Sequence, residues 1–423
     1  MFKVFANAWK IPDLRKKLLY TLMLLFVFRL GSAIPVPFVS AAALKEMLSG
    51  GDTLFSMYNI ISGGAFENAT IFAMSITPYI NSSIIMQLLS VAIPALERKA
   101  KEGEEGRKFI AQWTRYLTVV LALLQATGLY FGLAGAVTKR GIFTYLVVAL
   151  TLTAGTAFLM WLGEQINEKG IGNGISLLIF AGIVSRGPAT VTAIVEMFKA
   201  ETLNVFTLIA LLALVVAVIG IVVLMNNGER RIPVQYAKRV VGRKMYGGQS
   251  THIPIKVAMA GVMPIIFAIS IISFPATICQ LAGITANSQG FWGGFLRAMS
   301  QGSLLYGVLY FLLIIFFTYF YTEMQYNPVE MANNMKQNGG FIPGIRPGKT
   351  TVEFIKSILN KITLVGAIFL ALIAVLPMLL TNILGASLAF GGTSLLIIVG
   401  VALETVKQLE SQMLMRHYKG FLE

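Results

Sequence analysis

The chain holds few of the side chains that bind metals or act as nucleophiles. Its 423 residues include two histidines, His252 and His417, and one cysteine, Cys279. Because a zinc site takes three or four ligands, mostly His and Cys, this set is too small for a His- or Cys-based metal centre. A single cysteine also excludes an intramolecular disulfide.

Motifs for nucleotide binding, zinc proteolysis or serine hydrolysis are missing from the sequence. Three glycines of GIGNGIS, Gly170, Gly172 and Gly174, faintly resemble a phosphate-binding loop, but no strand precedes them and their spacing differs. A helix start that another backbone approaches closely explains them better. The sequence thus predicts that the chain is not an enzyme and uses no metal or cofactor.

Isoleucine pairs with helical spacing stand where two apolar segments begin. Ile76 and Ile80 are four residues apart, and so are Ile175 and Ile179, so each pair shares one helix face. Spacing alone favours ordinary packed or lipid-facing isoleucines. Polar residues beside the first pair favour an internal, partly wet passage instead; they are Thr77, Asn81, Ser82 and Gln87.

Long apolar segments must position these residues. Charged residues make up 13% of the chain and hydrophobic residues 56%, whereas a soluble protein is roughly 25% charged. Most of ten apolar segments approach the roughly 20 residues with which a helix crosses a bilayer, although the fifth and the tenth are short. They are too continuous for barrel strands. They are 18–38, 71–95, 116–137, 142–162, 171–185, 205–225, 257–282, 304–322, 362–385 and 388–403.

Lysine and arginine predict the orientation of these segments. With a cytoplasmic N-terminus, 27 of the 34 basic residues lie in cytoplasmic segments, as the positive-inside rule requires. Both termini are then cytoplasmic, and the net charge of +15 needs no nucleic-acid-binding face. Ten spans divide five and five around the polar stretch 186–204, and halves with odd numbers of spans run in opposite directions, as in inverted repeats.

Ionisable residues are rare in the middle of the segments. Glu164, Glu323 and Glu404 lie near cytoplasmic ends, and Arg29 lies near an outer end. Ion-coupled transporters place such groups at mid-membrane, so a small-solute transporter is a weaker alternative. An intramembrane enzyme is a second alternative, but the sequence offers no nucleophile paired with a base. Uptake or hydrolysis of a small molecule by the reconstituted protein would favour one of these alternatives.

Three polar segments interrupt the pattern. Residues 57–70 are too polar to span a membrane and too apolar for a simple loop. Residues 226–256 are basic and partly alternating, and Gly247 and Gly248 predict the turn of a hairpin. This hairpin is either a solvated positive loop or a docking surface for RNA or an acidic protein. Residues 326–356 are rich in glycine and proline.

Several longer motifs, in order along essentially the whole chain, resemble the SecY family, the pore subunits of the bacterial protein-conducting channel. They are FRLGSAIPVP (28–37), TPYINSSIIMQLL (77–89), KEGEEGRKFIAQWTRY (101–116), MWLGEQINEKGIGNGIS (160–176), RRIPVQYAKRVVGRKMYGGQSTHIP (230–254), MAGVMPIIFA (259–268), FPATI (274–278), FIPGIRPG (341–348) and FGGTSLL (390–396).

The resemblance implies an all-α membrane protein with ten transmembrane helices in two inverted five-helix halves around a central hourglass pore. The halves would be 1–190 and 205–423, joined by a hinge loop at 191–204. A ring of aliphatic side chains would close the pore, because a narrow collar of stiff β-branched residues excludes ions by dewetting. At the matching positions the ring is Ile76, Ile80, Ile175, Ile179, Ile266 and Ile397.

The resemblance also implies a plug and a lateral gate. The plug, a short distorted helix at about 57–70, would block the pore from outside with Ile60, Ile61, Gly63, Gly64 and Phe66. The gate would open to lipid between the second and third helices on one side and the seventh and eighth on the other. Residues near this seam would be Asn81, Gln125 and Phe274.

The implied function is the central subunit of a translocation channel in the bacterial plasma (inner) membrane. It would pass unfolded secretory polypeptides that bear signal sequences and release membrane helices into the lipid bilayer. Implied partners are the membrane subunits SecE and SecG, the motor ATPase SecA and the ribosome, contacted through its RNA. Loops 226–256 and 326–356 would dock the last two through Arg230, Arg231, Lys238, Arg239, Arg243, Lys244 and Arg346.

Overall fold

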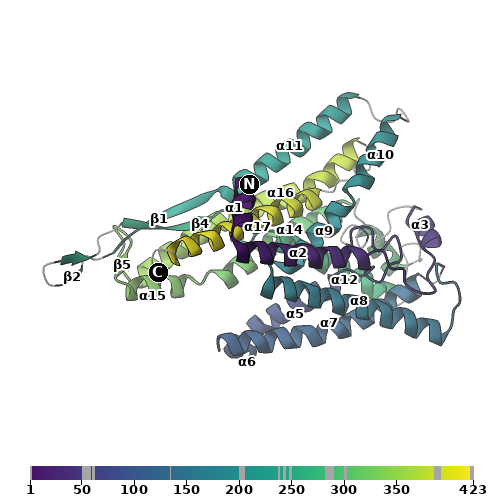
Figure 1. The fold of residues 1–423 in the computed structure, drawn as a ribbon, viewed down its shortest axis with the longest axis horizontal. Coiled ribbons are helices and arrows are strands. Elements are labelled where there is room, and N and C mark those ends of the chain that lie inside the picture. Colours follow the sequence, from purple (N-terminus) through teal and green to yellow (C-terminus); the bar gives the residue numbers. More distant parts are fainter. Residues whose placement is uncertain are drawn as a thin grey trace.

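The structure is a computed structural model in which long helices lie roughly side by side (Figure 1). A β-hairpin extends from one end of this helical body, here called the hairpin end. The opposite end carries α3 and the candidate plug and is called the plug end. The structure describes residues 2–49, 59, 62–133, 135–199, 205–236, 239–241, 244–246, 250–281, 290–299, 303–384 and 392–419.

Helices account for most of the described residues. They are α1 (Phe2–Lys10), α2 (Pro12–Gly31), α3 (Ala41–Ser49), α5 (Thr77–Ala92), α6 (Pro94–Ala100), α7 (Glu104–Gly132), α8 (Ile142–Lys169), α9 (Gly174–Ser185), α10 (Gly187–Lys199), α11 (Val205–Asn227), α12 (Met263–Leu281), α13 (Phe291–Ala298), α14 (Leu304–Gln325), α15 (Pro328–Gln337), α16 (Lys349–Leu384) and α17 (Gly392–Lys419).

Several of these helices are long and apolar enough to cross a bilayer. By length and composition, four stretches of the described residues qualify, namely Ile142–Lys169, Gly174–Glu196, Leu304–Gln337 and Lys349–Leu376. A fifth is added if α5 and α6 form one bent span. Two shorter apolar helical stretches are Leu212–Asn227 and Met263–Pro275. The chain is therefore a mostly helical, multi-pass membrane protein.

The apolar segment expected at 71–95 is not one straight helix, which corrects the sequence-based boundary. Residues 71–76 form turns, and Ser75 has a φ of 52°. The helix begins at Thr77 after Ile76, as Pro78 in its first turn predicts. It ends at Ala92 because Ile93 is extended and Pro94 starts a new helix. The axes of α5 and α6 differ by 106°.

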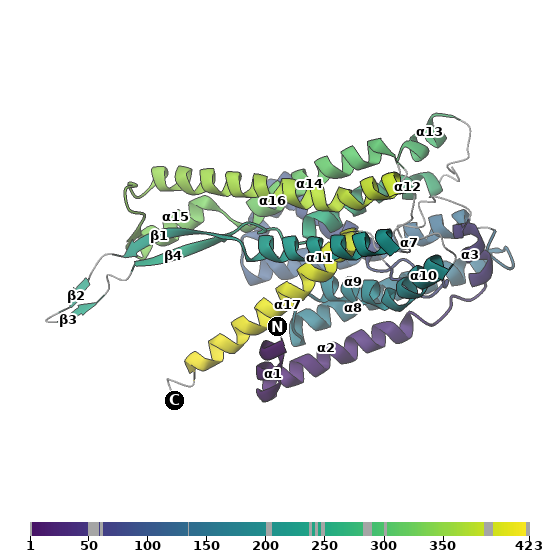
Figure 2. The same cartoon turned by 90° about the horizontal axis from the view of Figure 1, so that it is seen from above.

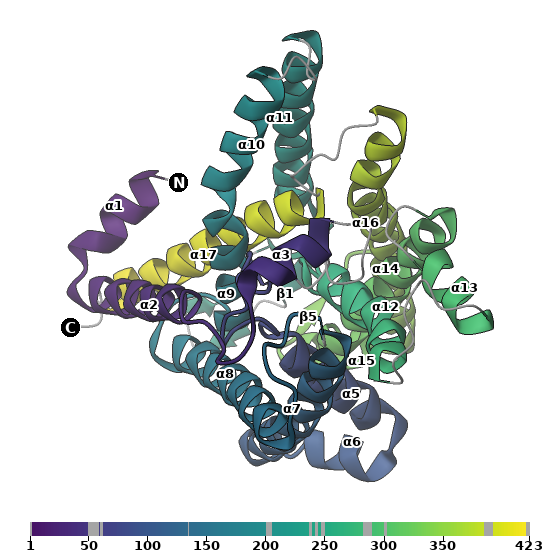
Figure 3. The same cartoon turned by 90° about the vertical axis from the view of Figure 1, so that its right-hand side faces the viewer.

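Contacts between helices close into a ring. α2 contacts α8, which contacts α7; α7 contacts α5 and α12; and α12 continues through α14, α16 and α17 to α9, which contacts α2 again. The end-on view shows the same succession (Figure 3). Buried residues from all these helices except α7, joined by α11, form the main apolar core. The fold therefore places one apolar core inside a closed ring of helices.

Strands form a small layer at the hairpin end, and they modify the all-α class that the sequence predicts. β1 (Glu229–Tyr236) pairs antiparallel with β4 (Ser250–Lys256) and with β5 (Gly340–Phe341), so the strand order is β4-β1-β5. Side chains from this sheet, α15 and α16 form a second apolar core, centred on Ile232, Val234 and Ile355. This core anchors the base of the hairpin that projects in Figure 2.

The tip of the hairpin consists of β2 (Arg239–Val241) and β3 (Lys244–Tyr246), which pair antiparallel. The predicted hairpin is thus confirmed, but its turn lies elsewhere. Val241 is the pairing partner of Lys244, so the chain reverses between these two residues. This is earlier than the Gly247–Gly248 turn that the sequence predicts, and both glycines lie outside the described residues.

Candidate pore, plug and lateral gate

Five of the six predicted ring isoleucines belong to the main apolar core, and the sixth packs against it. The five are at most 6% exposed, namely Ile76, Ile80, Ile179, Ile266 and Ile397, and the sixth is Ile175. Ile76 immediately precedes α5 and Ile80 lies on it, and the other four lie on α9, α12 and α17, which are remote in sequence. Aliphatic side chains from four helices can close a passage through the ring of helices without offering any polar group to an ion.

The start of α9 orients one of the isoleucine pairs. The Asn173 side chain accepts hydrogen bonds from the backbone N–H groups of Ile175, at 3.1 Å, and Ser176, at 3.3 Å, which caps the helix. A β-carbon on Gly174 would lie 2.0 Å from the Gly163 carbonyl oxygen. GIGNGIS is therefore a capped helix start with a close backbone approach, as the sequence analysis favours.

The candidate plug lies only partly within the described residues. Ile60 and Ile61 fall outside them, whereas Asn59 and 62–70 are described, the latter mostly as turns. Gly63 and Gly64 have φ values of 64° and 87°, which glycine adopts without strain. Ala65 is 2% exposed and belongs to the same core as the isoleucines. The segment thus contributes to the main apolar core.

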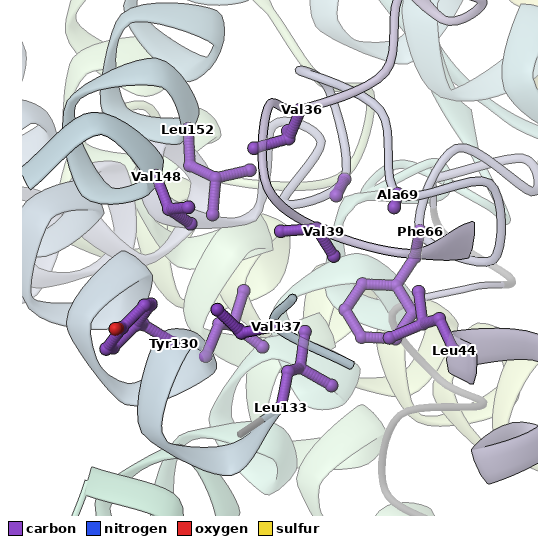
Figure 4. Close-up of a pocket in the computed structure, with 12 residues that line it drawn as sticks. Val36, Val39, Leu44, Phe66, Ala69, Tyr130, Leu133, Val137, Val148 and Leu152 are labelled. Carbon is purple, nitrogen blue, oxygen red and sulfur yellow. The ribbon is translucent and has the colours of Figure 1, made fainter. Parts of the chain in front are cut away.

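Phe66 fixes the candidate plug on its other side. Its ring is 1% exposed and lies beside Leu44 at an apolar cavity of ≈ 20 Å³ (Figure 4). The opposite wall of this cavity comes from α7 and α8. The residues around it include Val36, Val39, Leu44, Ala69, Tyr130, Leu133, Val137, Val148 and Leu152. Burial of a phenyl group contributes roughly 1.5–3 kcal/mol, so Phe66 holds this segment in place.

The predicted gate residues lie on α5, α7 and α12, and α12 packs along a seam with both of the other helices. Asn81 is 6% and Gln125 is 3% exposed, and Phe274 is half-buried. Among the described residues, no group bonds to either polar atom of the Gln125 amide. An unpaired buried polar group costs about 1–3 kcal/mol. The closed seam is therefore less stable than a fully apolar one of the same area.

A polar pocket at the hairpin-side mouth of the ring was not predicted. It has a volume of ≈ 260 Å³ and is lined by residues that include Asn173, Asn226, Lys256, Tyr321, Gln325, Glu404 and Lys407. Burial raises the pKa of Glu404 and lowers that of Lys407. The Lys407 ammonium donates to the Asn226 carbonyl at 2.6 Å. Glu404 and Lys407 are three residues apart on α17, just beyond an apolar run, and this spacing was the sequence signal that could have predicted the pocket.

The other two acidic residues singled out in the sequence lie at helix ends or surfaces. Glu164 on α8 accepts a hydrogen bond from Arg115 on α7 at 2.7 Å. Glu323 lines an open pocket between α14 and α16, near Lys356. Within the described ranges, no group of three or more His, Cys, Asp or Glu side chains could hold a metal ion.

The predicted docking residues are spread over the hairpin and the loop after β5. Arg230 and Arg231 are exposed on β1, and Arg231 Nη2 lies 2.6 Å from Glu229 Oε1. Arg346 is exposed in the second loop. Arg239 and Lys244 belong to β2 and β3, whereas Lys238 and Arg243 lie outside the described residues. The hairpin end therefore presents at least three exposed arginines.

Comparison with known proteins decides the family. The family model SecY matches residues 70–406. The protein translocase subunits SecY of Streptomyces coelicolor and Bacillus subtilis are each 47% identical to this chain, with complete coverage of both chains. This chain belongs to the SecY family. These two relatives are named as protein translocase subunits.

Solved structures agree with the SecY-family fold. A protein-conducting channel matches with a TM-score of 0.71 and 21% identity, over 94% of this chain and 92% of that chain. Sec61 in a canine ribosome–channel complex matches with a TM-score of 0.66 and 19% identity, over 94% of this chain and 92% of that one. At such identities the likeness establishes the fold of this SecY-family chain and leaves residue roles to be argued separately.

Proposed function

We propose that this chain is the pore-forming subunit of a protein translocase. It passes unfolded secretory polypeptides across a bacterial plasma membrane and releases membrane helices sideways into lipid. The observation that carries this proposal is a single apolar core, to which the predicted ring isoleucines belong or against which they pack, inside a closed ring of helices. Full-length identity of 47% to protein translocase subunits supports it.

The proposed architecture has ten spans in two inverted halves, 1–190 and 205–423, hinged at 191–204. The hairpin end and both termini face the cytoplasm, and the plug end faces outward. The distribution of basic residues supports this orientation, because 27 of 34 then lie on the cytoplasmic side. Contacts of α7 with α12 and of α9 with α17 join the two halves into one ring, which supports one pore between them.

In the proposed mechanism the isoleucine collar and the plug seal the resting channel. An aliphatic constriction has no group that replaces the hydration shell of an ion. A polypeptide widens the collar without losing specific contacts. Opening of the α5–α7–α12 seam lets the Gln125 amide reach water or a peptide backbone, which offsets part of the cost of parting the helices.

Partners supply the energy, because the chain itself has no candidate catalytic group. The proposed partners are SecA or the ribosome at the hairpin end, and SecE and SecG within the membrane. Arginines on the hairpin and after β5 suit ribosomal RNA, since a guanidinium binds phosphate oxygens in a bidentate manner. Arg230, Arg231 and Arg346 are the exposed candidates.

Ion conductance in planar bilayers tests the pore. We expect the wild-type channel to be nearly silent and a variant lacking 60–68 to conduct, because this segment blocks the aliphatic constriction from outside. A plug-deleted channel that stays at the baseline of protein-free bilayers would contradict the plug assignment and weaken the pore proposal.

A further inference from the structure

Backbone hydrogen bonds attach the C-terminal end of the candidate plug to the segment that follows α2, and this attachment is called the plug hinge. The Val36 N–H donates to the Ala69 carbonyl at 2.7 Å, and the Ile71 N–H donates to the Ile34 carbonyl at 3.0 Å. Pro35 and Thr70 form an isolated antiparallel bridge between these two bonds. Backbone bonds of this kind fix the position of the hinge without depending on side chains.

Arg186, between α9 and α10, bonds to the plug on both sides of its glycines. Arg186 Nη1 donates to the Asn59 carbonyl at 3.3 Å, and Arg186 Nη2 lies 3.9 Å from Glu67 Oε2. Asn59 Nδ2 donates to the same carboxylate oxygen at 3.0 Å, and the Glu67 N–H donates to Asn59 Oδ1 at 3.2 Å. The three residues thus form a closed cycle that spans the plug.

A second set of contacts reaches the plug through Ser185, the residue before Arg186. Arg29 Nη1 on α2 donates to Ser185 Oγ at 3.2 Å, and Ser185 Oγ donates to the Gly63 carbonyl at 3.4 Å and to that of Gly182 at 2.7 Å. A β-carbon on Gly63 would lie 2.2 Å from the Gly182 carbonyl oxygen. The end of α9 therefore contacts the plug through both backbone and side chains.

We propose that Arg186 and Glu67 form a latch that holds the plug closed, with Asn59 positioning the carboxylate. This inference rests on the proposed channel function. Glu67 is the only acidic residue in 57–70, so the plug has one carboxylate to offer to an arginine. The two side chains are 36% and 35% exposed, so dissolved ions reach the pair from the outer solution. Such a pair is weak and is screened by salt, which suits a contact that must break at each opening.

The latch is tested by recording spontaneous openings of the channel, assembled with its membrane partners, in planar bilayers. Glu67→Gln removes the ion pair, and we expect the open fraction to rise about threefold. Arg186→Gln also removes the hydrogen bond to Asn59, and a rise of about tenfold is expected. Because both act on one contact, the double variant should open no more often than Arg186→Gln alone. Lys139→Gln, an exposed basic residue in the α7–α8 loop, is the matched control and should leave the open fraction unchanged.

Salt in the outer compartment gives a second readout. Raising it from about 0.1 M to about 1 M shortens the Debye length from ~10 Å to ~3 Å. The open fraction of the wild type should rise, whereas that of Glu67→Gln should not respond. In parallel, Ala65→Cys, which is 2% exposed in the closed plug, should react faster with an impermeant thiol reagent when Arg186→Gln is added.

The outcomes separate the latch from the channel proposal. If deletion of 60–68 causes conductance and Arg186→Gln behaves as Lys139→Gln does, the latch is wrong and the channel stands. Additive effects of the two substitutions would also overturn the latch, since each residue would then act through a different partner. Absence of conductance even after the deletion would count against the channel itself.

Discussion

Single residues decide whether the constriction stays dry. Ile80 is 4% exposed and belongs to the same core as Ile179, Ile266 and Ile397. Ile80→Asn adds an amide that hydrates the collar, so we expect single-channel recordings of the plug-deleted protein to show roughly severalfold higher ion conductance. Ile80→Val is the matched control, because it keeps a stiff aliphatic surface and should stay at the level of the deletion alone. Equal conductance of the two variants would remove Ile80 from the collar.

At the scale of elements, the charges of the β1–β4 hairpin matter for docking. Its neighbouring residues Arg230 and Arg231 differ in whether an acidic side chain pairs with them. Arg231 is paired with Glu229, whereas Arg230 is exposed beside it. Arg230→Gln should therefore weaken ribosome binding more than Arg231→Gln and lower the slope of log affinity against log salt by about 1. Glu229→Gln, which frees Arg231, should strengthen binding. Co-sedimentation at several salt concentrations measures these effects, and an unchanged slope for Arg230→Gln would exclude a phosphate contact.

The orientation of the whole molecule can be tested by labelling. Cys279 is 3% exposed, so an impermeant maleimide should give little background. Lys139→Cys, in the exposed loop between α7 and α8, should label in intact cells. Lys101→Cys, in the exposed loop between α6 and α7, should label only in inverted vesicles, because the proposed orientation places it in the cytoplasm. The reverse pattern would invert the proposed topology.

Local signals in the sequence were sufficient for several parts of the fold. Low charge and long apolar runs identify a membrane protein, because lipid accepts only segments that satisfy their own backbone. Pro78 predicts the start of α5, and the glycines of GIGNGIS predict a closely approached helix start. Alternation predicts the hairpin. Each of these depends on the conformational preferences of a few adjacent residues.

Other features depend on contacts between distant parts of the chain and were decided only by the tertiary structure. Such features are the 106° bend between α5 and α6 and the packing of α5 against α12. The register of Val241 with Lys244 likewise moves the hairpin turn. Spacing alone favoured ordinary packed or lipid-facing isoleucines, and only the tertiary structure places Ile76 and Ile397 in one apolar core. The pairing of Glu67 with Arg186 has no sequence signal, because a surface ion pair between distant residues follows from the fold and not from local propensity.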